Sequence, residues 1–188
     1  MSGFLPFIGR QYEDSIYGAR VMILGLSHYG DPEDAYPEFT RDVIDENAYA
    51  PGNRFFTLLT NLLRLSKDAP DDTERRAAWE QVAFYNYIQD IVGITSRISP
   101  TPEMWDEARQ PFLNVVKELK PQIIIVLGTQ LWDQLPEVDA IEWCWVKHPS
   151  SGSFSYDEAF SNFKKALENI KNKKGQDNCS EGLNCQCE

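Results

Sequence analysis

The sequence predicts an α/β fold, built as a three-layer α/β/α sandwich around a four-stranded parallel sheet. Short apolar runs of strand length alternate with longer segments that have helical periodicity. Each apolar run is also followed by a loop with distinctive polar side chains. Right-handed crossovers place successive strands of such a chain in one parallel sheet, with helices on both faces. The chain has 188 residues, which suits one domain with one core.

Four apolar runs are predicted to be strands: residues 20–24, 81–85, 122–127 and 141–146. The third has three consecutive isoleucines, which is typical of a strand buried on both faces. Gly25 breaks the first run, and Asn86 follows the second. The polar groups that follow the strands are therefore expected at one edge of the sheet, where ligands bind in this class of fold.

Helices are predicted between these strands. Apolar residues at helical spacing predict a helix over 53–65, and Thr101 followed by Pro102 predicts the start of another that runs to about residue 120. Ser155 with Glu158 three residues later predicts a capped helix over 155–172. Shorter helices are predicted at 73–80 and 129–135. The acidic segment 27–51 is predicted to be a long loop, with a loop interrupted by helical pieces as the alternative.

Residues 1–172 are predicted to form a single domain, followed by a disordered tail at 173–188. The tail is polar and contains Cys179, Cys185 and Cys187, whose spacing lacks the paired pattern of a zinc site. Cys144 lies in an apolar run and is predicted to be a core residue. No apolar run reaches the length of a membrane span and no secretion signal begins the chain, so a cytoplasmic protein is expected.

The formal net charge of −11 is unevenly distributed. Residues 31–46 carry seven acids and one base, and residues 68–80 carry five acids and two bases. The rest of the chain is therefore close to neutral. The overall charge argues against a surface coated for nonspecific nucleic-acid binding, but it leaves room for a neutral or basic face elsewhere.

Both histidines of the chain follow predicted strands. His28 lies in the stretch Gly-Leu-Ser-His-Tyr at 25–29, and His148 lies in Val-Lys-His-Pro-Ser-Ser-Gly at 146–152. Their positions predict a single site at the edge of the sheet, together with Asn86, whose amide can pair with the edge of a nucleobase. No glycine-rich phosphate loop follows the first strand, so no nucleotide cofactor is predicted.

Two other chemistries are compatible with these residues. Ser27 and the histidines are compatible with a serine hydrolase, although the second glycine of the nucleophile elbow is missing. His28, His148 and an acid such as Asp31 are compatible with a metal site, although no closely spaced pair of ligands occurs. The preferred prediction is a site without metal.

Taken together and in order, the motifs resemble those of the uracil-DNA glycosylase superfamily, over about residues 19–166. The blocks that carry the resemblance are Ile-Leu-Gly-Leu-Ser-His-Tyr at 23–29, Pro-Gly-Asn-Arg-Phe-Phe at 51–56, Phe-Tyr-Asn at 84–86, the segment 119–128, and His-Pro-Ser-Ser at 148–151. The resemblance implies a DNA glycosylase that rotates one nucleotide out of the duplex to reach its glycosidic bond.

The resemblance also implies a role for each matching residue. His148 would stabilise the charge that develops on the departing base, with Ser27 and His28 in the first catalytic motif and Ser27 positioning water. Base binding would fall to four residues and DNA binding to three: Asn86, Phe55, Phe56 and Tyr29 for the base, and Ser150, Ser151 and Lys147 for the DNA. No metal, cofactor, membrane or protein partner is implied.

The first motif departs from the family pattern, because Ser27 stands where most members have Asp or Asn. Serine is no carboxylate base, so strong water activation requires another acid, such as Asp31 or Asp34. With this change and the added His28, the expected substrate is a uracil-like or modified pyrimidine, with modified phage DNA and host defence as one hypothesis. The alternative is a catalytically weak module that binds a nucleotide, modified DNA or a protein.

Overall fold

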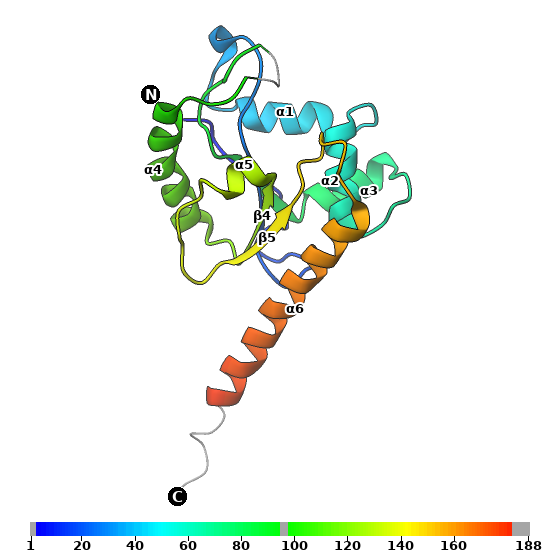
Figure 1. The fold of residues 1–188 in the computed structure, drawn as a ribbon. Coiled ribbons are helices and arrows are strands. Elements are labelled where there is room, and N and C mark those ends of the chain that lie inside the picture. The colour runs from blue at the N-terminus through cyan, green and yellow to red at the C-terminus, as the bar shows by residue number, and fades with distance from the viewer. Residues whose placement is uncertain (1–2, 95–97, 182–188) are drawn as a thin grey trace, which may run out of the picture.

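A computed structural model describes residues 3–94 and 98–181 of the chain. Its centre, where Figure 1 labels β4 and β5, is a mixed, mostly parallel five-stranded sheet. The strand order is β1-β3-β2-β4-β5. The strands are β1 (Phe7–Ile8), β2 (Val21–Gly25), β3 (Val82–Asn86), β4 (Ile123–Leu127) and β5 (Glu142–Val146). Strands β2 to β5 match the four predicted runs to within a residue or two at each end and pair in parallel.

The prediction of a four-stranded, wholly parallel sheet is wrong. A fifth strand, β1, pairs antiparallel with β3, with Phe7 opposite Phe84 and Ile8 opposite Ala83. Two residues are too short a run to show the alternation that identifies a strand, so this strand is invisible in the sequence pattern. By adding β1, the N-terminal arm covers the outer edge of β3.

Helices pack against both faces of the sheet because the central strands are buried on both sides. Alternate residues of β2, β3 and β4 enter two separate apolar clusters, with Ile23 and Phe84 in one and Leu24 and Tyr85 in the other. The first cluster includes residues of α1 (Phe39–Asn47), α2 (Arg54–Arg64), α3 (Asp72–Trp79) and α6 (Tyr156–Glu181). The second includes residues of α4 (Pro102–Leu119) and α5 (Thr129–Trp132).

The segment predicted to be a long loop contains regular structure. A 3-10 helix, η1 (Pro32–Asp34), is followed by α1. Thr40 and Ile44 of α1 are fully buried, four residues apart on one helical face. The strongly acidic composition conceals this short apolar face in the sequence. Helix α1 therefore contributes a wall to the region beyond the ends of β2 and β3.

The last helix continues beyond its predicted end. Helix α6 runs to Glu181, nine residues past Asn172, and its C-terminal part extends away from the sheet in Figure 1. The prediction of a disordered tail from residue 173 is wrong for 173–181, while residues 182–188, with Cys185 and Cys187, lie outside the described part. Cys144 is buried and unpaired, as predicted for a core residue. In the described ranges, no helix is both long and apolar enough to cross a membrane.

Candidate functional site

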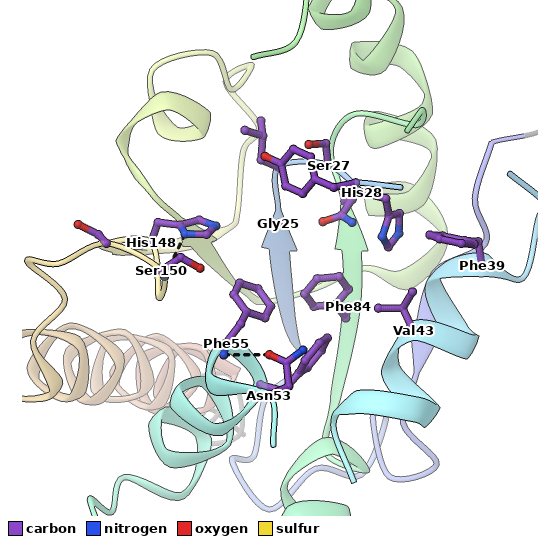
Figure 2. A pocket seen from close by; sticks show the side chains of 15 residues that line it. Gly25, Ser27, His28, Phe39, Val43, Asn53, Phe55, Phe84, His148 and Ser150 are labelled. Atoms are coloured by element: carbon purple, nitrogen blue, oxygen red, sulfur yellow. Dashed lines mark hydrogen bonds between the residues drawn. The ribbon is translucent and has the colours of Figure 1, made fainter. Parts of the chain in front are cut away.

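A cavity of about 570 Å³ opens beyond the carboxyl ends of β2 and β3 (Figure 2). Nine of the ten candidate residues line it: Ser27, His28, Tyr29, Phe55, Phe56, Asn86, His148, Ser150 and Ser151. They come from the ends of three strands and from the start of α2. The convergence predicted from the parallel sheet is therefore present, whereas the role of each residue stays a prediction.

Asn86 is the last residue of β3, and Gly25 is its register partner at the end of β2. The Asn86 side chain lies over Gly25, so closely that a Cβ added at residue 25 would overlap Oδ1 of Asn86. Asn86 is only 4% exposed. No residue in the described part of the chain hydrogen-bonds to its side-chain amide, which lines the cavity. Because the amide faces the cavity, a ligand that pairs with it can take the place of water as its hydrogen-bond partner.

His148 follows β5 and is oriented by its own loop. The backbone N–H of Ser150 donates a hydrogen bond to Nδ1 of His148 over 3.2 Å. In the neutral imidazole, this bond assigns the proton to Nε2, which is left as a donor. Burial lowers the pKa of His148, so the neutral form is favoured. The loop thus presents an uncharged hydrogen-bond donor.

The two phenylalanines at the start of α2 have different environments. The Phe55 ring is half-buried and lies 5.7 Å from the His148 ring, centroid to centroid, at an interplanar angle of 38°. Asn53 caps α2 by accepting a hydrogen bond from the Phe55 N–H, as Figure 2 shows. Phe56 packs against Trp79 in the core and is 5% exposed. Phe55 is therefore the better surface on which to stack a base.

His28 is held in the wall between β2 and α1. Its Nε2 is 2.8 Å from Oγ1 of Thr40, and the edges of Phe4 and Phe39 meet its ring. The side chain is 6% exposed, and burial lowers the pKa of His28 to about 4. Above this pH the imidazole stays neutral. Through its hydrogen bond with Thr40, His28 connects the loop that follows β2 to helix α1.

Ser27 forms no nucleophile–base pair with either histidine. Its Oγ is buried and has no hydrogen-bond partner in the described part of the chain. Among the described residues, none of the side chains that line the cavity is acidic. Asp31 and Asp34 are exposed, and the Asp31 carboxylate accepts a hydrogen bond from the N–H of Glu33 at the start of η1. Neither Asp31 nor Asp34, the two acids considered for water activation, lines the cavity.

The DNA-contact candidates divide into two groups. Ser150 is exposed and Ser151 is half-buried at the rim, where Ser151 Oγ lies 2.9 Å from Ser153 Oγ. Lys147 does not line the cavity, and its ammonium instead forms an ion pair with Glu158 at 2.9 Å. The predicted contact of Lys147 with DNA thus competes with a neighbour in α6.

No cluster of three or more His, Cys, Asp or Glu side chains suited to a metal ion occurs among the described residues. The alternative metal site would need His28, His148 and Asp31 together. Thr40 occupies Nε2 of His28, and Asp31 caps η1. His28 and Asp31 are therefore engaged in separate structural contacts, and Asp31 does not line the cavity with the two histidines.

Sequence reasoning missed part of the cavity wall, namely Leu26, Phe39, Val43, Asn53 and Phe84. Phe84 carried a usable signal, because it lies two residues before Asn86 on the same face of a strand. Phe39 and Val43 carried none that stood out, since they lie in a segment dominated by acids. Helix α1 brings them to the side of the cavity opposite His148 in Figure 2.

Burial of neutral His28 makes stability depend on pH. In the unfolded chain this group titrates near its ordinary pKa of 6.5, and in the folded protein near 4. As pH falls from 6.5 towards 4, the unfolded state therefore binds more protons and folding loses free energy. The loss from this group between pH 7 and pH 5 is about 2 kcal/mol.

Denaturant unfolding at pH 7 and pH 5 measures this effect. The His28→Gln variant should lose less stability over this interval than the unmodified protein, by about 2 kcal/mol. Asn114→Ala, at an exposed position on α4, is the control, because it leaves both buried imidazoles in place. An identical pH dependence in the protein with and without His28 would contradict the assignment.

Gly25→Ala should displace the Asn86 amide, since a methyl group there would overlap Oδ1 of Asn86. Crystal structures or amide ¹⁵N–¹H spectra of the variant should show the Asn86 side chain in a new position, with the fold retained. Gly152→Ala is the control, because a Cβ there meets no atom within 4 Å. An unmoved Asn86 amide in Gly25→Ala would refute the steric argument.

A search of protein-family models found no match to this chain, and a search of curated proteins found no significant match. The family resemblance therefore stays a prediction from the sequence motifs.

Proposed function

We propose that this protein is a DNA glycosylase, which hydrolyses the N-glycosidic bond of a flipped uracil-like or modified pyrimidine and leaves an abasic site. The observation that carries the proposal is the unpaired Asn86 amide, 4% exposed, in a cavity lined by aromatic rings and an imidazole. A base inside a duplex is inaccessible, so such an enzyme must extrude it into a pocket of this kind.

Base binding combines hydrogen bonding and stacking. The Asn86 amide offers a donor and an acceptor side by side, which matches the N3–H and O4 edge of a uracil ring. Phe55 offers a half-buried ring face, and stacking of a base on an aromatic ring contributes about 1–3 kcal/mol. Tyr29 and Phe84 would limit the position of the ring in the cavity.

Catalysis in this proposal depends on stabilising the departing base. As the glycosidic bond breaks, negative charge develops on the base and its O2 oxygen. A neutral His148 with its proton on Nε2 can donate to that oxygen, and its orientation is set beforehand by the Ser150 N–H. Donors preorganised in this way contribute about 3–4 kcal/mol to lowering the barrier.

In this proposal, activation of the attacking water contributes less to catalysis than stabilisation of the departing base. No carboxylate from the described part of the chain lines the cavity, so Ser27 would position the attacking water without acting as a strong base. The cation-like sugar left by bond breakage is itself a strong electrophile, so a positioned neutral water is sufficient for a slow enzyme. We therefore expect modest turnover compared with an enzyme that has a carboxylate base.

DNA is the proposed partner, with the Ser150–Ser151 rim pressing on the backbone beside the extruded nucleotide. Hydroxyl and backbone N–H groups bind phosphate without adding net positive charge. This suits a chain with a net charge of −11. The proposed role is in repair, or in host defence against phage DNA with modified pyrimidines, in the cytoplasm.

The proposal is tested by measuring base release by mass spectrometry from DNA that contains uracil or modified pyrimidines. Asn86→Ala and His148→Ala should each lower kcat/KM by about 10²–10³, the usual cost of losing one preorganised donor. Asn114→Ala, at an exposed position on α4, is the matched control and should retain activity. Absence of base release from the whole panel, with folded protein, would refute the enzyme proposal for those bases.

The second candidate function is a binding module that retains the base pocket without turnover. The absence of acidic side chains from the cavity wall favours it. It predicts that a nucleoside or modified DNA binds tightly and is recovered intact, and that Ser27→Ala leaves Kd unchanged. Calorimetric titration together with product analysis separates the two candidates, because only the glycosylase consumes its ligand.

A further inference from the structure

The two borders of the sheet differ in how they are protected from other chains. At one border lies β1, a strand of only two residues. At the other border, β5 pairs with β4 in continuous register over five residues, from Glu142 to Val146. This strand contains no proline, no lysine and no bulge, the features that commonly prevent a border strand from pairing with another molecule.

The backbone of β5 directs one set of polar groups away from the sheet. The N–H of Glu142 and the C=O of Val146 form their hydrogen bonds on the side of β4. Because the direction alternates along a strand, the N–H and C=O groups of Trp143 and Trp145 point outward. Neither of these N–H groups has a hydrogen-bond partner in the described part of the chain. The Trp145 C=O accepts from the Asn162 amide of α6, but a carbonyl oxygen can accept a second hydrogen bond.

We propose that β5 of one copy of this chain pairs antiparallel with β5 of a second copy, centred on Cys144. Two copies would then form a two-fold dimer with one continuous sheet. Antiparallel pairing directs the carboxyl ends of the two sheets in opposite directions, so the two candidate sites would face away from each other. The inference does not depend on the proposed enzymatic activity.

Pairing about Cys144 satisfies the outward groups of both copies, because the sequence Trp-Cys-Trp at 143–145 reads the same in both directions. Trp143 of each copy would lie opposite Trp145 of the other. In an antiparallel ladder, opposite residues that point towards each other exchange both of their N–H···O bonds. Each outward N–H of one copy would therefore donate to an outward C=O of the other copy.

The side chains of β5 also suit a second copy. Trp143 and Trp145 are two residues apart and so lie on one face of the sheet, the face that α5 covers in part. The Trp143 ring contacts Trp132, which is 40% exposed, at 6.3 Å between ring centroids. Cross-strand aromatic pairs stabilise antiparallel ladders, and tryptophan is enriched in protein interfaces. The pairing would bring the tryptophans of both copies together on this face.

The distribution of charge favours this border over the other. Residues 142–174, which form β5 and most of α6, carry four acids and six bases. The strongly acidic segments 31–46 and 68–80 supply α1 and α3, which contact β1 and β3 at the opposite border. Two chains with a net charge of −11 each repel least where the local charge is not negative. Within the paired strands, Glu142 would lie opposite Val146, so no like charges would meet.

Sedimentation velocity in reducing buffer tests the assembly, since the buffer excludes disulfide links between chains. The unmodified protein should change from one chain to two as its concentration rises. Amide hydrogen exchange tests the location. The N–H groups of Trp143 and Trp145 should exchange about tenfold or more slowly where the dimer dominates than where the single chain dominates. The N–H of Glu142, which donates to Gln122 O on β4, is the internal reference and should change far less.

Two substitutions at Trp145 form a matched pair. Trp145→Pro and Trp145→Val both remove the indole, but only proline removes the outward N–H. That N–H forms no hydrogen bond with the described part of its own chain, so the single chain should still fold, as circular dichroism would show. The Kd of the dimer should be about tenfold or more higher for Trp145→Pro than for Trp145→Val, because two hydrogen bonds between the copies are lost.

Trp132→Ser is the control for association through exposed tryptophan, because Trp132 lies outside β5. It should retain the dimer. Loss of the dimer in Trp132→Ser but not in Trp145→Pro would assign the contact to the tryptophan surface and overturn strand pairing.

The remaining outcomes each decide one part of the proposal. A single-chain mass at every concentration would overturn the dimer, and open-ended oligomers would overturn two-fold pairing, which closes at two chains. A dimer in which the Trp143 and Trp145 amides exchange at unchanged rates would overturn its location at β5. None of these measurements requires base release, so a failure here leaves the glycosylase proposal unaffected, and the reverse also holds.

Discussion

The candidate site depends on the contact between Asn86 and Gly25 at the ends of two paired strands. Because β2 and β3 are parallel and in register, their last residues lie side by side at the same edge of the sheet. Only a residue without a side chain leaves room for the Asn86 amide at that position. The sheet thus directs the amide of Asn86 into the cavity, beside the aromatic rings and the imidazoles that also line it.

The electrostatics of the cavity follow from the burial of its two imidazoles. Both have a lowered pKa, and desolvation is the cause in each case. They are nevertheless constrained differently. His28 is bound through Nε2 to a side chain of α1, whereas His148 accepts at Nδ1 from the backbone of its own loop. One imidazole therefore joins secondary-structure elements, and the other keeps its second nitrogen for a ligand.

Much of the cavity could be predicted from the sequence, because the carboxyl ends of parallel strands lie at the same edge of the sheet. The apolar run 122–127 and the positions of Gly25, Asn86 and His148 were sufficient to predict a common cavity. The pattern could not predict β1, which has two residues, or α1, whose apolar face is hidden among acids. The end of α6 was also missed, since its last turns are polar on all sides and carry no apolar periodicity.

The contribution of individual residues was harder to predict than their convergence. Lys147 and Ser150 are near neighbours in one loop, but only Ser150 faces the cavity while Lys147 pairs with Glu158. Phe55 and Phe56 are adjacent on a helix, so they point in directions about a quarter-turn apart and meet different surroundings. Such differences depend on side-chain direction, which a motif match does not record.

The short strand β1 has a consequence for behaviour in solution. A strand at the border of a sheet exposes unpaired N–H and C=O groups, which can recruit the border strand of another molecule. By pairing with Phe84 and Ala83, the N-terminal arm occupies those groups along β3. Loss of the first ten residues, by proteolysis or in a shortened expression product, would expose the unpaired N–H and C=O groups of β3. The shortened protein would then tend to self-associate through the strand that carries Asn86.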